Sequence, residues 1–122
     1  MRKRRTIAVV MEGGPVRQLL AGALALGGYE VRVAGSGRGA PGPPQRERLD
    51  LILMDAALPA TDSTEALRRI RAGDRGARVV AFSGRPTVEM ARRARDLGAR
   101  EFVGNPFDLR TLLRVIADNA RP

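Results

Sequence analysis

Leu51-Ile52-Leu53-Met54-Asp55 is the stretch that decides the fold of this chain. Four consecutive apolar residues are typical of a short strand buried on both faces, because a strand with one solvated face alternates apolar and polar residues. The run ends at a carboxylate, and Leu58-Pro59 then turns the chain. In α/β proteins, ligands bind beyond the carboxyl ends of such strands. Asp55 is therefore the first candidate functional residue.

Similar apolar runs, separated by helical patterns, occur on both sides of this stretch. Further strands are predicted at 7–10, 29–34, 79–82 and 102–103. Helices are predicted to begin at Pro15, at a capping box formed by Asp62-Ser63-Thr64-Glu65, at Thr87 and at Asp108. Such alternation predicts a parallel sheet with helices on both faces.

Residues 35–48 interrupt this alternation. The segment is rich in glycine and proline and has no hydrophobic periodicity. Adjacent prolines with glycines around them strongly oppose a helix. We expect a flexible connection here, with the second helix of the fold missing or disordered and at most one helical turn near 45–48.

Length and composition limit the chemistry. The 122 residues amount to one ordinary domain, and 43% hydrophobic residues suffice for a core. The chain has no cysteine and no histidine, which excludes disulfides, the commonest metal ligands and serine–histidine catalysis. We do not expect an enzyme. Only carboxylates remain as metal ligands, and they favour a hard cation such as Mg²⁺.

The chain is strongly basic, with a net charge of +9. Residues 1–5 form a basic N-terminal arm that carries four of these charges, and residues 6–122 form the domain. A basic nucleic-acid-binding module is one interpretation. An arginine-rich composition typical of a GC-rich genome is the favoured alternative, because no aromatic residues interleave with the arginines. No apolar run is long enough to span a membrane, so we expect a cytoplasmic protein.

Taken together, the strand ends resemble those of a response-regulator receiver domain, and the resemblance covers essentially the whole chain. The matching stretches are Ile7-Ala8-Val9-Val10-Met11-Glu12, Leu51-Ile52-Leu53-Met54-Asp55 with Leu58-Pro59, Val79-Val80-Ala81-Phe82-Ser83-Gly84, and Leu97-Gly98-Ala99 through Asn105-Pro106-Phe107. The resemblance implies a flavodoxin-like, doubly wound sheet of five parallel strands in the order 2-1-3-4-5.

The resemblance also implies roles for individual residues. Asp55 falls at the phosphoacceptor position, which takes a phosphoryl group from a histidine kinase. Ser83 and Phe102 fall at the two switch positions. Glu12, Asp55 and the backbone carbonyl of Ala57 fall at the positions that hold Mg²⁺. A turn-capping role is the alternative for Asp55, but the surrounding matches favour the phosphoacceptor position. Glu12 is equally compatible with a solvated position, and Phe102 with core packing.

Two residues depart from the family pattern. Met11 replaces the first of two acidic residues, and Asn105 replaces a lysine. Methionine does not hold a water for Mg²⁺, and a neutral amide makes a weaker hydrogen bond than a charged group. We therefore predict a signalling or protein-interaction module with impaired or absent phosphorylation and weak or absent Mg²⁺ binding. A phosphorylation-competent receiver remains the alternative.

A basic face is predicted near the C-terminal end of the chain, where the sequence is similar to receivers of winged-helix regulators. In those proteins the fourth helix, fifth strand and fifth helix commonly mediate dimers. The corresponding face carries Arg92, Arg95, Arg100, Arg110 and Arg114. A homodimer through this face is one expectation, and a solvated face is the other. A C-terminal DNA-binding effector domain is expected if the chain is a fragment.

Overall fold

The computed structural model describes residues 4–34, 48–104 and 108–120. The strands are β1 (Thr6–Val10), β2 (Glu30–Ala34), β3 (Leu51–Asp55), β4 (Val79–Phe82) and β5 (Glu101–Val103). The helices are α1 (Pro15–Leu26), α2 (Ala60–Gly73), α3 (Val88–Asp96) and α4 (Leu109–Asn119). Each predicted strand and helix is present, with bounds that differ by a few residues.

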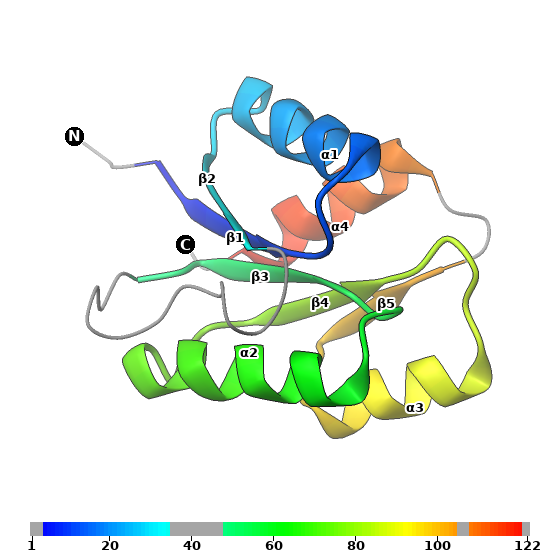
Figure 1. Cartoon of the computed structure of the whole chain (residues 1–122). Helices are drawn as coiled ribbons and strands as arrows, with labels where there is room; N and C mark the ends of the chain where they lie inside the picture. The colour runs from blue at the N-terminus through cyan, green and yellow to red at the C-terminus, as the bar shows by residue number, and fades with distance from the viewer. Residues whose placement is uncertain (1–3, 35–47, 105–107, 121–122) are drawn as a thin grey trace.

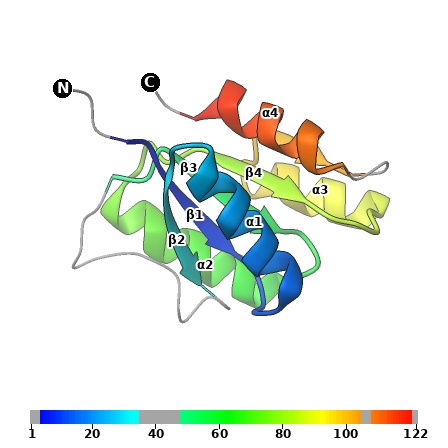
Figure 2. The same cartoon turned by 90° about the horizontal axis from the view of Figure 1, so that it is seen from above.

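The five strands form one parallel sheet in the order β2-β1-β3-β4-β5. Helices α1 and α4 cover one face of the sheet, and α2 and α3 cover the other (Figures 1 and 2). The predicted flavodoxin-like order is therefore confirmed. The order reverses between β1 and β3, which places the crevice for a ligand at the carboxyl ends of these two strands.

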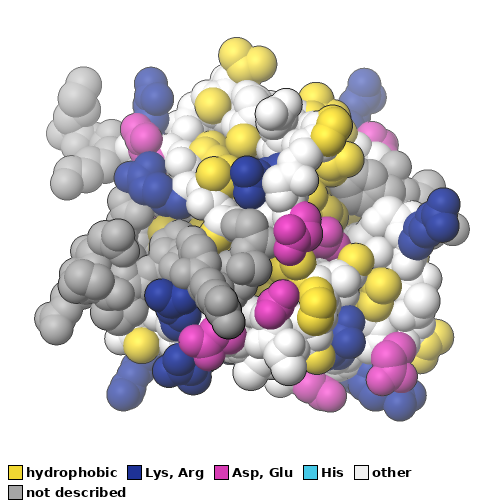
Figure 3. Space-filling view, in the orientation of Figure 1, with side chains coloured by type: hydrophobic (Ala, Val, Ile, Leu, Met, Phe, Trp, Pro, Cys, Tyr) yellow, Lys and Arg dark blue, Asp and Glu magenta, His cyan; other side chains and the backbone are white. Residues whose placement is uncertain are grey.

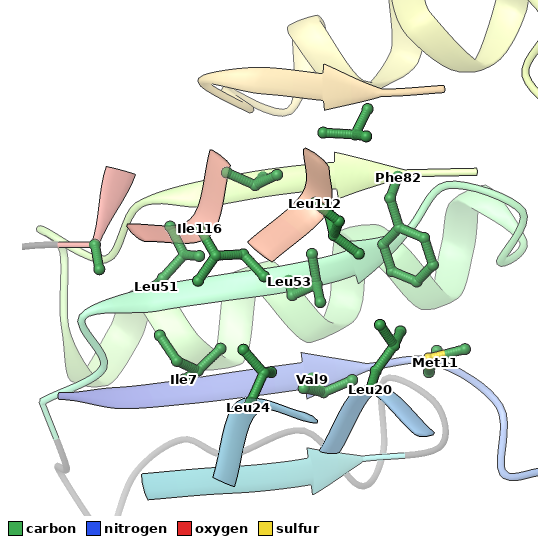
Figure 4. Close-up of a cluster of buried hydrophobic side chains, with 13 residues drawn as sticks. Ile7, Val9, Met11, Leu20, Leu24, Leu51, Leu53, Phe82, Leu112 and Ile116 are labelled. Atoms are coloured by element: carbon green, nitrogen blue, oxygen red, sulfur yellow. The ribbon is translucent and has the colours of Figure 1, made fainter. Parts of the chain in front are cut away.

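Two large hydrophobic clusters hold the layers together. The first lies between the sheet and helices α1 and α4, and Figure 4 shows its side chains, among them Leu53, Leu112 and Ile116. The second lies on the opposite face, under α2. All residues of β1 and β4 are buried, as are the first four of β3. Burial on both faces explains why these strands appear in the sequence as continuous apolar runs.

Most of the predicted helix ends are confirmed. Pro15 begins α1. The Thr87 hydroxyl accepts a hydrogen bond from the Met90 N–H at 3.1 Å, and the Asp108 carboxylate accepts one from the Arg110 N–H at 3.0 Å. Gly98 follows α3 with a φ of 88°, a conformation that favours glycine. These local signals fix where the connecting loops begin.

The predicted capping box is wrong. Helix α2 begins at Ala60, directly after Pro59, and no side chain caps it. The extended ψ of Pro59, 144°, turns the chain so that the next residue starts the helix. Glu65 consequently lies inside α2, where it pairs with Arg68 at 2.7 Å.

Three predictions fall wholly or partly outside the described residues. They concern the basic arm at 1–5, of which residues 4 and 5 are described, the glycine- and proline-rich segment at 35–48, of which only residue 48 is described, and Asn105. Across the described ranges, no helix combines the length and apolar character needed to cross a membrane.

Candidate functional site

The carboxyl ends of the strands bring the candidate residues into one row. Val10 pairs with Met54, and Asp55 pairs with Phe82, which in turn pairs with Val103. The next position after Val10 is Met11, so Met11 lies beside Asp55 at the end of β1. Neighbouring strands are about 5 Å apart. Sequence reasoning placed these strand ends together, and the register confirms that arrangement.

Asp55 sits at the start of a tight turn and is half-buried. Its Oδ1 accepts a hydrogen bond from the Ala57 N–H at 2.8 Å. Its backbone carbonyl accepts one from the Leu58 N–H at 3.2 Å. The Ala56 N–H donates to the Phe82 carbonyl at 2.8 Å, which ties the turn to β4. The carboxylate is thus oriented by its own loop and still reaches solvent.

Met11 does not face solvent. Its side chain is 6% exposed and belongs to the cluster between the sheet and helices α1 and α4. Figure 4 shows it at the end of β1, near Leu20. Its N–H donates to the Ala34 carbonyl at 3.0 Å, which continues the β1–β2 pairing. The first acidic position of the family pattern is therefore occupied by a core side chain.

Ser83 follows β4 and is 3% exposed. Its N–H donates to the Val103 carbonyl at 3.0 Å, and its Oγ accepts from the Arg85 N–H at 3.1 Å. The hydroxyl therefore closes a local turn in this structure. It lies one residue beyond Phe82, the pairing partner of Asp55, at the edge of the same crevice.

The oxygen donors available for a cation are few. Glu12 and Ala57 are exposed, and Asp55 already accepts a hydrogen bond. Among the residues that the structure describes, no three acidic side chains come together in a group that could hold a metal ion. A magnesium ion needs near-octahedral oxygen ligation. Mg²⁺ usually binds one or two carboxylates and completes its shell with water, so Glu12, Asp55 and the Ala57 carbonyl would supply its protein ligands, without the carboxylate that typical receivers have at position 11.

Phe102, the second switch position, lies on β5 and is half-buried. It packs against a small cluster formed by Ala56, Ala81 and Ala94. These residues come from the turn after β3, from β4 and from α3. Phe102 also lines a groove of about 360 Å³ between α3 and β5, whose lining combines apolar and charged side chains. The aromatic ring therefore lies between the turn at Asp55 and the outer surface.

The predicted arginine face divides into two parts. Arg92, Arg95 and Arg100 line the groove between α3 and β5, with Glu101 beside them. Arg110 and Arg114 are exposed on α4, away from the groove lining. Elsewhere, the face seen in Figure 3 carries charges of both signs, with hydrophobic side chains at its top, where α1 lies. Val16 and Leu19 of α1 are 52% and 59% exposed.

Sequence reasoning missed three polar contacts. Arg93 of α3 donates to the backbone carbonyl of Ala56 at 3.0 Å. Asn119, 5% exposed, bonds to Glu101, to the Val115 carbonyl and to Arg100. The buried carboxylate of Asp50 accepts from the Thr6 N–H at 2.8 Å. No spacing in the sequence singles out these residues, because every one of these partners except Val115 lies 18 or more positions away.

An α/β sheet of this order, with a carboxylate at the end of its central strand, is the arrangement of receiver domains. The family model for the response regulator receiver domain matches residues 7–117. The chain belongs to this family, and it is a receiver domain of the two-component response-regulator type.

Relatives with known names agree with this assignment. The chain is 33% identical over 110 residues to the regulatory protein AtoC of Escherichia coli, covering 90% of the chain and 24% of AtoC. It is 32% identical over 82 residues to sporulation initiation phosphotransferase F of Bacillus subtilis, covering 67% of the chain and 66% of that protein. The chain thus spans less than two thirds of both relatives.

Solved structures agree with the fold. Chemotaxis protein CheY4 of Vibrio cholerae superposes with a TM-score of 0.79 at 24% identity, over 95% of this chain and 98% of that one. At this identity the likeness concerns the fold alone.

Proposed function

We propose that this chain is an atypical receiver domain that acts as a signalling or protein-interaction module, with impaired or absent phosphorylation at Asp55. The observation that carries the proposal is the burial of Met11. An exposed acid at this position would stand next to Asp55 and hold a cation. A thioether packed in the core offers neither charge nor an oxygen ligand.

The chemistry of phosphoryl transfer supports this view. Phosphoryl transfer depends on positioning and on neutralising the charge of the phosphoryl oxygens, usually with metal ions and cationic side chains. The replacement of the family lysine by Asn105 removes one cation from the sequence. The acceptor carboxylate Asp55 therefore keeps its place with fewer groups to assist it.

The interaction surface that we propose is the groove between α3 and β5. Three arginines and one glutamate line it, together with valine, alanine and phenylalanine side chains. Arginine is enriched in protein interfaces, and a net positive rim favours a partner with acidic side chains. A homodimer through α3, β5 and α4 remains a narrower proposal, in which Arg110 and Arg114 would meet acidic residues of a second copy.

The partners that we propose follow from the family. Receiver domains interact with histidine kinases and often carry C-terminal effector domains. One relative, NtrC of Azospirillum brasilense, is named a DNA-binding transcriptional regulator, and the chain covers 23% of it at 31% identity. We propose that this domain is cytoplasmic and that its partner is a histidine kinase or another signalling protein. The domain itself is not proposed to be an enzyme.

A phosphorylation-competent receiver is the second candidate. The observation that favours it is the retention of Asp55 in an oriented, solvent-accessible state, with the hydroxyl of Ser83 at the edge of the same crevice. A domain of this kind would take a phosphoryl group on one Asp55 oxygen and release the leaving group of the donor.

One experiment separates the two candidates. The chain is incubated with Mg²⁺ and acetyl phosphate, or with Mg²⁺ and beryllofluoride, and is followed by intact mass and by amide NMR. We expect no stable adduct and little change at Ser83 and Phe102. A stable adduct that is absent from the Asp55→Ala variant, together with shifts at both switch positions, would establish the competent receiver instead. A typical receiver treated in parallel controls for the activity of the reagents.

A further inference from the structure

Helix α3 is held to the rest of the domain by little apolar burial. Of its nine residues only Ala94 is buried. Beneath Ala94 lie the small side chains of Ala56 and Ala81, and the larger Met90 and Phe102 pack against this cluster only partly buried, so the apolar contact area is limited. A segment with few buried apolar contacts opens at a lower free energy than the core. Polar contacts therefore contribute more than usual to holding α3 in place.

Arginine side chains supply two such contacts, one from within α3 and one at its C-terminal end. The guanidinium of Arg93 donates to the Ala56 carbonyl at 3.0 Å. The guanidinium of Arg71, from α2, donates to the Leu97 carbonyl at the end of α3, at 2.9 Å. The second contact joins α3 to a helix. The first joins α3 to the turn that carries Asp55.

The carbonyl that Arg93 binds lies at a sensitive point. Ala56 follows Asp55 directly, and its N–H is bonded to β4. The next N–H, of Ala57, is bonded to the Asp55 carboxylate itself. A change at that carboxylate therefore alters the peptide geometry of the turn, and Arg93 is the side chain of α3 bonded to that turn.

We propose that Arg93 is a positioning residue that couples the turn at Asp55 to α3, and so to the groove between α3 and β5. The groove residues Ala91, Arg92 and Arg95 flank Arg93 on the same helix. A shift of the Ala56 carbonyl moves the guanidinium, and the helix follows because so little else anchors it. The inference rests on the proposed function only in taking this groove as the interaction face.

The test uses the full chain and needs neither phosphorylation nor a partner. Asp55→Ala removes the acceptor of the Ala57 N–H and so changes the turn. Amide chemical shifts of 88–102 are compared between the chain with and without this substitution. The same comparison is made in an Arg93→Gln background, and Arg92→Gln, on the neighbouring position of α3, serves as the matched control for loss of one charge.

We expect the shifts that Asp55→Ala causes in α3 to fall about three-fold in the Arg93→Gln background and to persist with Arg92→Gln. Arg93→Lys keeps a donor and should restore part of the effect. Equal shifts in the Arg93→Gln and Arg92→Gln backgrounds, or no shift in α3 of the otherwise unchanged chain, would overturn the proposal. If Asp55→Ala does not fold, Asp55→Val, which also removes the acceptor of the Ala57 N–H and suits the end of a strand, takes its place.

This test is independent of the adduct experiment. A domain that forms a stable Asp55 adduct can still show Arg93-dependent coupling, and then the proposed impairment fails while the inference holds. If the domain forms no adduct and the α3 shifts do not depend on Arg93, the proposed impairment holds and the inference about Arg93 fails.

Discussion

Met11 and Asp55 occupy neighbouring positions at the ends of β1 and β3, yet their side chains meet opposite environments. The Met11 side chain is 6% exposed and packs in the core. Asp55 is half-buried, and its carboxylate is bonded to the turn that follows it. Two of the positions that hold carboxylates in typical receivers therefore differ here: position 11 belongs to the core and position 55 to the site.

The first prediction concerns the stability cost of restoring the acid at position 11. Met11→Asp places a carboxylate where an apolar side chain now packs, and unpaired buried charge is strongly unfavourable. We expect a loss of about 2–4 kcal/mol in the free energy of unfolding, measured by urea denaturation at neutral pH. Met11→Leu conserves volume and should cost less than about 1.5 kcal/mol.

A loss for Met11→Asp no larger than that for Met11→Leu would contradict the burial of this side chain. In that event the carboxylate introduced at position 11 reaches solvent, and calorimetry should test whether the variant binds Mg²⁺ more tightly.

A second prediction concerns the anchor of α4. The buried Asn119 amide donates to Glu101 and to the Val115 carbonyl, and its oxygen accepts from Arg100 at 3.1 Å. Asn119→Ala leaves these groups without that partner, and a lost buried hydrogen bond costs about 1–3 kcal/mol. Amide hydrogen exchange should show the largest loss of protection at the end of α4 and the start of β5. Asp118→Ala, at an exposed neighbouring position, should change the exchange little.

Exchange that rises equally throughout the sheet for Asn119→Ala would argue against a local anchor. It would show instead that the network supports the whole domain.

A third prediction concerns the titration of Glu65. Its hydrogen bond with Arg68 lowers the pKa of the Glu65 carboxyl below its ordinary 4.5, against a smaller opposing effect of desolvation. Because the pKa is lower in the folded chain, the pair stabilises α2 above pH 4.5 and loses this effect as the pH falls through the lowered value. NMR titration of the Glu65 side chain should show a midpoint below 4.5, and Arg68→Gln should raise it. An unchanged midpoint in Arg68→Gln would assign the effect to another group.

Much of the fold could be predicted from the sequence because the signals are local. The continuous apolar runs of β1, β3 and β4 reflect burial on both faces, and Thr87 and Asp108 cap their helices through neighbours two or three residues away. The capping box at 62–65 failed for a physical reason. The proline before Ala60 already set the start of α2, so the acidic and hydroxyl residues fell inside the helix.

The candidate site was less predictable. The resemblance located Asp55, Ser83 and Glu12 at strand ends, which the sheet register supports. The burial of Met11 and the contact between Arg93 and Ala56 depend on how α1 and α3 pack on opposite faces of the sheet. Such contacts join residues far apart in sequence, and periodicity within one helix carries no information about them.

The last prediction concerns Asp50, one of the two aspartates that flank β3. Asp50 precedes the strand and is 8% exposed. Its N–H donates to the Thr6 carbonyl and its Oδ2 accepts from the Thr6 N–H, both at 2.8 Å, so it fastens the start of β1 to β3. Asp50→Ala leaves a buried N–H without that acceptor, and we expect a loss of about 2 kcal/mol by urea denaturation. Asp50→Asn keeps an oxygen acceptor and should lose less stability.

The control is Asp96→Ala, because Asp96 is an exposed aspartate on α3. This substitution should change the free energy of unfolding by no more than about 0.5 kcal/mol. Equal stability of Asp50→Ala and Asp96→Ala would contradict this structural role of Asp50.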